Sequence, residues 1–283
     1  MAVFDWYQGT ARAGVDDVIG AVLGLSDGAF LAHSKGMHGY GTTTTIRGPE
    51  GPVGQVWHGG THHHPHFVFS GEMAQPGAEL IRAEFPEHQV SRSDVREDYD
   101  EEDAFDRMQP VLLDAARIHR VQVGTAGDHL LTKVGRTVYL GSPKSPCRMR
   151  MYDKAAELRA VFSADPVRLA TVPEHRTRLE LQVRPQTREA KQRFSNIEPQ
   201  AVLGSCAWSR QVWRDVGGLE LVPVRVTVPY RQADGARAYA YMLAQYGAVL
   251  RAQFEDLGDW LCVGRQIGHD LAEFDRAKRN RLR

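Results

Sequence analysis

The sequence predicts an α+β fold, with a mostly antiparallel β-sheet, helices packed on one face of it, and a smaller helical C-terminal part. Short runs of alternating polar and apolar residues recur along the chain, and residues 176–183 alternate most cleanly. Stretches with apolar residues at helical spacing follow several of these runs. Beyond Pro185 the patterns become mainly helical. We therefore expect one domain over residues 1–185 and a mainly helical region over residues 186–283.

Composition bounds the class of protein. The chain has 283 residues, 42% of them hydrophobic, which suffices for one large domain or two small ones. Its 35 basic and 35 acidic residues balance, so any nucleic-acid surface must be local. Three cysteines without CxxC spacing argue against a disulfide framework or structural zinc site and favour a reducing cytoplasm. No apolar run approaches the roughly 20 residues of a membrane span, and the N-terminus does not resemble a signal peptide.

The N-terminal third predicts short strands separated by helices. Residues 2–7 alternate as a strand, which we expect to turn at Gln8-Gly9-Thr10. A short amphipathic helix follows over residues 15–23, and another helix begins at residue 78 and is limited by Pro86. Further strands are expected within residues 36–46, 55–58 and 67–70.

A histidine cluster lies between two of these strands. It comprises His58, His62, His63, His64 and His66. Imidazoles at this density could bind a transition metal. His64-Pro65-His66 also resembles the His-hydrophobe-His strand motif of rolling-circle nucleases, but proline is poor inside a strand. A loop of solvated histidines is the alternative interpretation.

Residues 90–100 are rich in charge and are predicted to be extended. As a strand they place four charged side chains on one face, namely Asp94, Arg96, Asp98 and Asp100. Two carboxylates four residues apart on a strand face could hold a hard divalent cation, Mg²⁺ or Mn²⁺. A solvated acidic strand end is the alternative, because the acidic run continues to Asp103. A helix is then expected over residues 101–120, with Pro110 kinking it or starting a second helix.

A β-hairpin is predicted over residues 137–152. The first strand, residues 137–140, is followed by a turn rich in Gly, Ser and Pro and by a second alternating run, residues 148–152. In the second strand Met149 and Met151 face one side. Arg148, Arg150 and Tyr152 face the other side, close to Lys154. A phenol among cations could attack a phosphodiester and hold the product as a phosphotyrosine. A half-buried strand tyrosine flanked by solvated arginines is the alternative.

The remaining chain supplies one more charged strand and several helices. In the strand of residues 176–183, Glu180 lies on the polar side with Arg178 and Gln182. Glu180 is therefore a third carboxylate for the face that carries Asp94 and Tyr152. Helices are expected from residue 153 to 160 and over residues 187–194 and 198–212, an edge strand over residues 219–228, and a longer helix capped by Asp234. The basic tail, residues 276–283, could touch a DNA backbone.

Four segments, in order, resemble one family. Phe4-Asp5-Trp6 with Gly9-Thr10 resembles its opening strand, and residues 92–99 (RSDVREDY) resemble its R-x-D-x-x-x-D-aromatic segment. Residues 137–157 resemble its YxGS…S…R-x-Y-[DE]-K-x-x-E signature, and residues 178–181 (RLEL) resemble its R-x-E-hydrophobic strand. The chain thus resembles the Rep_trans family of rolling-circle replication initiators of phages and plasmids, which is related to relaxases of integrative elements. Arg96-Glu97 departs from the apolar residues that the family usually has there.

The resemblance implies roles for particular residues. Tyr152 would be the nucleophile, with Tyr139 as the alternative. The metal ligands, for Mg²⁺ or Mn²⁺, would be Asp94, Asp98, Glu157 and Glu180. Arg150 and Lys154 would stabilise the charged phosphate and help lower the pKa of the tyrosine. Lys144, Arg148 and Arg178 would contact DNA.

The function that the resemblance implies is initiation of rolling-circle DNA replication. Residues 1–185 would nick one strand at an origin, keep the 5′ end as a phosphotyrosine and later religate it. Residues 186–283 would recognise DNA or form a homodimer. The expected partners are double-stranded or hairpin origin DNA, its single-stranded product, and a host helicase and polymerase, with no membrane. Two other functions stay open: a non-catalytic DNA-binding regulator on the same fold, and a metallonuclease using His62, His64 or His66.

Overall fold

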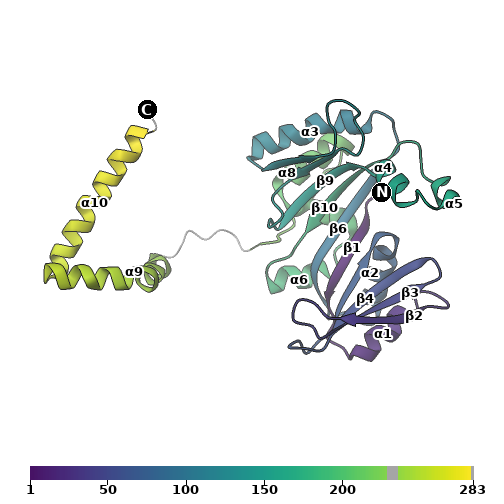
Figure 1. Cartoon of the computed structure of the whole chain (residues 1–283), viewed down its shortest axis with the longest axis horizontal. Helices are drawn as coiled ribbons and strands as arrows, with labels where there is room; N and C mark the ends of the chain where they lie inside the picture. The colour runs from purple at the N-terminus through teal and green to yellow at the C-terminus, as the bar shows by residue number, and fades with distance from the viewer. Residues whose placement is uncertain (228–234, 282–283) are drawn as a thin grey trace. The chain divides into compact units, whose positions relative to one another are not determined.

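The computed structural model describes residues 1–227 and 235–281 (Figure 1). The chain forms two compact units, Met1–Val228 and Pro229–Arg283. The first unit therefore extends well beyond Pro185, and the helices directly after that proline belong to the same unit as the sheet. The expected division of function at residue 185 stays a prediction.

A ten-stranded antiparallel sheet forms the centre of the first unit (Figure 1). Its strands lie in the order β2-β3-β4-β5-β1-β6-β10-β9-β8-β7. Their bounds in that order are Phe30–Lys35, Thr42–Gly48, Gly51–His58, His66–Ser70, Val3–Thr10, Gln89–Tyr99, Thr177–Val183, Cys147–Asp153, Thr137–Leu140 and Val123–Ala126. The three charged strands predicted from the sequence, β6, β10 and β9, are direct neighbours.

Helices pack on the apolar face of this sheet, which confirms the predicted α+β fold. They are α1 (Val15–Leu23), α2 (Ala74–Glu84), α3 (Ala104–His119), α4 (Lys154–Val161), α6 (Arg188–Phe194), α7 (Pro199–Val202) and α8 (Ala207–Gly217), with short 3₁₀ turns at Gly71–Met73 and Leu203–Ser205. The short helix α5 (Pro166–Leu169) has no buried residue. The second unit consists of α9 (Gly235–Leu257) and α10 (Trp260–Arg281). Among the described residues, no helix is both long and apolar enough to cross a membrane.

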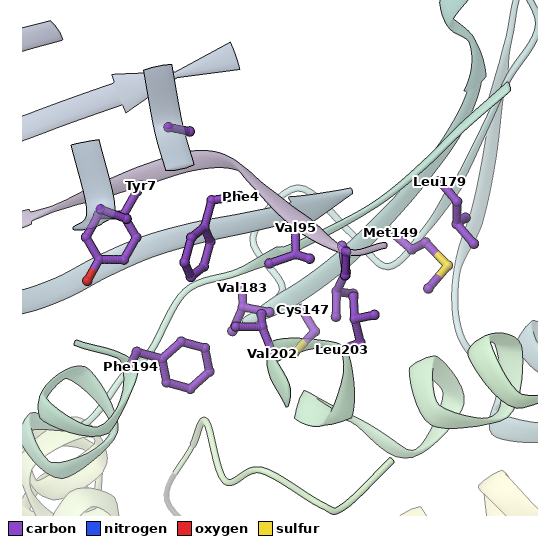
Figure 2. Close-up of a cluster of buried hydrophobic side chains, with 14 of the residues drawn as sticks. Phe4, Tyr7, Val95, Cys147, Met149, Leu179, Val183, Phe194, Val202 and Leu203 are labelled. Atoms are coloured by element: carbon purple, nitrogen blue, oxygen red, sulfur yellow. The ribbon is translucent and has the colours of Figure 1, made fainter. Parts of the chain in front are cut away.

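The core lies between the sheet and these helices. Figure 2 shows side chains from four adjacent strands, among them Val95, Met149 and Val183, together with Phe194, Val202 and Leu203 from the helical layer. All of them are buried, because alternation along each strand sends every second side chain toward the helices. The polar residues between them consequently share the opposite face of the sheet.

Strand β1 carries a bulge that matters for this polar face. Phe4 is opposite Val95 and Trp6 is opposite Asp94, so Asp5 is an extra residue between two paired positions. Phe4 before the bulge and Tyr7 after it both face the core, so the bulge shifts the alternation by one residue between them. Asp5 lies on the polar face and reaches Arg178 on β10, at 2.8 Å.

Several predicted elements differ from the structure. Strand β1 continues to Thr10 instead of turning at Gln8, and the edge strand β2 was not predicted. Helix α3 runs through Pro110 without a second start, because Phe105, Met108 and Leu112 around the proline bury its apolar side. The predicted helix over residues 198–212 is two helices separated by a 3₁₀ turn.

The segment after α8 was predicted as an edge strand and is not one. In its described part, residues 219–227, the segment bonds to the helical layer: Leu219 N–H donates to the carbonyl of Trp213 in α8, and Val224 N–H to that of Gly204 in the 3₁₀ turn, at 3.1 Å. Pro223 contributes no amide hydrogen to a ladder. Apolar contacts of Leu221 and Val226 with the core hold the segment instead. Asp234, the predicted helix cap, lies outside the described residues.

Candidate active site on the polar face of the sheet

The predicted hairpin forms and presents its charged side as expected. Strands β8 and β9 pair in a register that places Thr137 opposite Tyr152 and Tyr139 opposite Arg150. Met149 and Met151 are fully buried on the helix side. Tyr152 and Arg150 therefore lie on the polar face, which confirms the alternation read from the sequence.

Strand β10 brings the third predicted carboxylate to this face. Glu180 lies opposite Arg150 on one side and Arg96 on the other. It accepts a hydrogen bond from Nη2 of Arg150, at 2.7 Å. Burial raises the pKa of Glu180 above its usual range, and the charge of Asp94 raises it further. The sheet thus places a buried acid beside the arginine that neighbours the candidate nucleophile.

Tyr152 is buried and surrounded by cations. The residue is only 5% exposed. The guanidinium of Arg150 lies 4.1 Å from the centre of its ring, and the ammonium of Lys154 lies 5.8 Å from it. The resemblance implied that Arg150 and Lys154 help lower the pKa of the tyrosine. The charge of Arg150 does lower it, as does that of Arg178, but burial and the charge of Glu180 outweigh them, and the pKa of Tyr152 is raised overall. Ionising this phenol requires further positive charge.

Tyr139 lies beside a small polar cavity. The cavity has a volume of about 170 Å³ and is lined by Arg92, Tyr139, Arg148, Arg150, Glu180 and Gln182. The guanidinium of Arg148 stacks 4.2 Å from the ring centre of Tyr139. Three arginines around a cavity of this size suit a phosphate group. Tyr139 therefore stays a structurally reasonable alternative to Tyr152.

Arg178 is the centre of a buried ion network that sequence reasoning missed. It donates to both carboxylate oxygens of Asp98, at 2.7 and 2.9 Å, and to Asp5, at 2.8 Å. Arg96 also pairs with Asp5, at 2.9 Å, and with Asp98. These bonds tie β1, β6 and β10 together beneath the predicted site. Alternation places these side chains on one face of their strands, but it does not show which strands are neighbours.

The four predicted metal ligands do not gather in one place. In the part of the chain that the structure describes, no group of three or more His, Cys, Asp or Glu side chains could hold a metal ion. Asp94 accepts hydrogen bonds from Arg92 and from Gln182, whereas Asp98 belongs to the Arg178 network. Glu157 pairs with Lys154, at 2.7 Å, at the start of α4.

Asp94 and Glu180 come nearest to a metal-binding pair. They are diagonal neighbours across β6 and β10, and each is almost fully buried on the polar face. Mg²⁺ commonly takes one or two carboxylates and completes its shell with water and substrate phosphate. The residues therefore fit an ion shared with a phosphate, provided that Arg92 and Arg150 move from the carboxylates to the phosphate.

The remaining predicted site residues lie around the hairpin. Lys144 is exposed on the turn between β8 and β9, and Arg148 reaches the cavity beside Tyr139. Arg178 is only 6% exposed, so its bonds to Asp5 and Asp98 give it a structural role besides the predicted contact with DNA. Asp153 caps α4 by accepting a hydrogen bond from Ala156 N–H, at 2.9 Å. That cap fixes where Lys154 leaves the strand.

The histidine cluster divides into exposed and buried members. His62, His63 and His64 are exposed in the loop between β4 and β5, whereas His66 begins β5 and is 7% exposed. The ring of His66 stacks on Trp57, with centres 5.0 Å apart, and its Nδ1 lies 3.2 Å from the hydroxyl of Thr10. The described residues thus show His64 and His66 in different environments.

The buried ring of His66 predicts a pH dependence of stability. Burial lowers the pKa of His66 to about 4, and the nearby His38 and His62 contribute. Since the unfolded value is about 6.5, the unfolded chain binds the proton more tightly than the folded one. The contribution of neutral His66 to the free energy of unfolding is therefore complete above pH 6.5 and is lost as the pH falls toward 4. From pH 7 to pH 5 the free energy of unfolding of the wild type should therefore fall by about 2 kcal/mol more than that of His66→Phe.

Urea unfolding at the two pH values measures this difference. His63→Gln, a change at an exposed histidine of the same loop, is the matched control and should unfold like the wild type at both. An identical pH dependence in wild type and His66→Phe would contradict the assignment of a neutral, buried His66.

The fold of this chain is similar to that of a known protein. The chain is similar to the structure of a rolling-circle replication initiator protein from Geobacillus stearothermophilus, with a TM-score of 0.50 and 17% sequence identity. The similarity covers 78% of this chain and 98% of that chain. No family model matches the chain, and no curated protein matches it. At this identity the likeness shows a shared fold, and it confirms the initiator fold that the sequence resemblance implied.

Proposed function

We propose that this protein initiates rolling-circle replication by nicking one DNA strand through a tyrosine nucleophile. The observation that carries the proposal is the position of Tyr152, on the polar face of a sheet with the initiator fold, between Arg150, Lys154 and Arg178. Cations around a phenol stabilise both the phenolate and the phosphate that it attacks. The adjacent cavity with Arg92, Arg148 and Arg150 offers a place for that phosphate.

The chemistry is one transesterification that is later reversed. The Tyr152 oxygen forms a bond to phosphorus as the phosphorus–O3′ bond breaks, so the 5′ end becomes a phosphotyrosine. The phenol loses its proton, and the 3′ oxygen takes one up and becomes a primer for a polymerase. Because one phosphoester replaces another, the strand can be rejoined when a 3′-hydroxyl attacks the phosphotyrosine.

The arginines would change partners during this reaction. In the described state Arg92 and Arg150 neutralise Asp94 and Glu180. A scissile phosphate in the cavity would compete for both guanidiniums and would leave the two carboxylates for Mg²⁺ or Mn²⁺. The ion, when bound, supplies positive charge that polarises the phosphate and favours ionisation of the phenol.

A DNA-binding regulator without nicking activity is the second candidate. The observation in its favour is that Tyr152 has a raised pKa and that each predicted metal ligand already has a cationic partner. A structural ion network on an inherited fold would have the same features. Binding to origin DNA is common to both candidates, whereas a covalent product belongs only to the first.

Covalent capture tests the proposal without knowledge of the origin. The full chain is incubated with randomised single-stranded oligonucleotides labelled at the 3′ end, with Mn²⁺ or with EDTA, and adducts are separated on denaturing gels. We expect a labelled adduct only with Mn²⁺, and a released fragment that a polymerase extends from its 3′-hydroxyl. Cleavage without an adduct would instead favour a histidine metallonuclease, and binding without cleavage would favour the regulator.

A further inference from the structure

Two leucines project into solvent from the loop that precedes strand β8. Leu130 and Leu131 lie in the loop between β7 and β8 and are 88% and 89% exposed, and Val134 in the same loop is 61% exposed. Single exposed apolar residues are ordinary, but three within five positions of one loop are a candidate binding surface.

The backbone that carries the leucines is held in one shape. The carboxylate of Asp128 accepts hydrogen bonds, each of 2.9 Å, from the amides of Leu130, Leu131 and Thr132 and from the Thr132 hydroxyl. These bonds fold the loop tip around one side chain and leave both leucines outside it. The apolar tip is thus built by the loop's own polar residues.

The base of the loop is anchored to the rest of the domain. Arg136 stacks its guanidinium 4.0 Å from the ring centre of Phe105 on α3, and it also pairs with Asp106. The ring of His129 lies 6.0 Å from Phe105, and Lys133 pairs with Asp106, at 3.3 Å. The loop is therefore anchored to α3 by these contacts and bonded within itself at the tip.

The C-terminal end of the loop pairs with the strand that carries the candidate nucleophile. Thr137, the first residue of β8, is opposite Tyr152 in the sheet. The carbonyl of Arg136, at the end of the loop, accepts a hydrogen bond from the amide of Asp153, at 3.1 Å. The segment that carries Leu130 and Leu131 is therefore bonded to the residue that follows Tyr152.

We propose that the loop of residues 127–136, which we name the leucine loop, is a wedge that separates DNA bases next to the scissile phosphate. This inference rests on the proposed function. Tyr152 is buried in a sheet face, so a phosphodiester inside a regular duplex needs local opening to reach it. Apolar side chains inserted between base steps unstack them and open the duplex. The cations around Tyr152 and at the loop's base would hold the flanking phosphates.

The test compares cleavage of paired and unpaired DNA. A sequence recovered by covalent capture is prepared as a single strand and as a duplex, and both are cleaved by wild type and by the double variant Leu130→Ser/Leu131→Ser. Because both side chains are almost fully exposed, these changes leave the packing of the domain untouched. Phe30→Ser, at an exposed position on the opposite edge strand β2, is the matched control.

If the loop acts as a wedge, the double variant should lose cleavage rate only on base-paired DNA. The double variant should cleave the duplex at least about tenfold more slowly than wild type and the single strand at the same rate, because only the duplex requires unstacking. With EDTA present, 2-aminopurine beside the nick site should brighten on binding wild type and Phe30→Ser but not the double variant. Asp128→Ala, which frees the loop tip, should give an intermediate loss on the duplex.

Three results would overturn the inference. Equal loss on both substrates would mean that the leucines serve general binding, and unchanged cleavage of both would mean that they face another partner. In either case single-strand capture by wild type still supports the proposed function. If wild type captures no strand at all, the proposed function fails and the wedge fails with it.

Discussion

Tyr152→Phe should abolish covalent capture of DNA and reduce nicking by at least about 10⁴-fold, since no other group on the protein replaces a lost nucleophile efficiently. The ring and its stacking with Arg150 remain, so the variant should unfold at the same urea concentration as wild type. Binding of the captured sequence should also persist. Gel assays of the adduct, together with a filter-binding or fluorescence titration, measure these properties separately.

Tyr139→Phe is the matched control for this variant. Tyr139 lies across the β8–β9 pair and has its own stacked arginine, Arg148, so the change is chemically equivalent. We expect the adduct to form at a similar rate, with a modest loss if the phenol helps to position the phosphate in the cavity. If Tyr139→Phe loses the adduct and Tyr152→Phe keeps it, the roles of the two tyrosines are the reverse of those proposed.

Arg178→Met should be the most destabilising single change on the polar face. Its side chain is 7% exposed and pairs with Asp5 and Asp98, two poorly solvated carboxylates that would keep only Arg96 as a shared cationic partner. Removing one partner of a buried ion pair commonly costs about 3–5 kcal/mol. Arg178→Lys keeps the charge but not the planar fork that binds both oxygens of Asp98, so it should lose less. Urea unfolding at pH 7 gives both values.

Arg176→Met provides the comparison on the neighbouring position. Arg176 also makes two bonds to a carboxylate, Asp100, at 2.7 and 2.8 Å, but that carboxylate is 56% exposed. Water replaces such a partner, so the loss should stay below about 1 kcal/mol. Equal effects of Arg176→Met and Arg178→Met would show that the Asp5–Arg178–Asp98 network does not hold the sheet together.

The hairpin and the faces of its residues could be predicted because alternation is a local signal. Met149 and Met151 turn to the core and Arg150 and Tyr152 to the polar face, as the period of a strand requires. Glu180 follows the same rule on β10. Arg178 was predicted to contact DNA, which stays a prediction, and its contacts in the structure are with the carboxylates of Asp5 and Asp98.

The partners of these residues could not be predicted in the same way. Asp5 and Arg178 are far apart in the chain, and they meet because β1, β6 and β10 are neighbours in the sheet. Alternation indicates the face on which a residue lies, but it does not show the order of the strands. The leucine loop was likewise hidden, because an exposed leucine and a core leucine look alike until burial is known.

Mapping the covalent adduct by mass spectrometry tests the central claim most directly. Wild-type protein is captured on its substrate with Mn²⁺, the DNA is digested to a short remnant, and tryptic peptides are sequenced. The account predicts a nucleotide phosphate on the phenolic oxygen of Tyr152. A remnant on Tyr139 or on another residue, or strand cleavage that leaves every peptide unmodified, would contradict it.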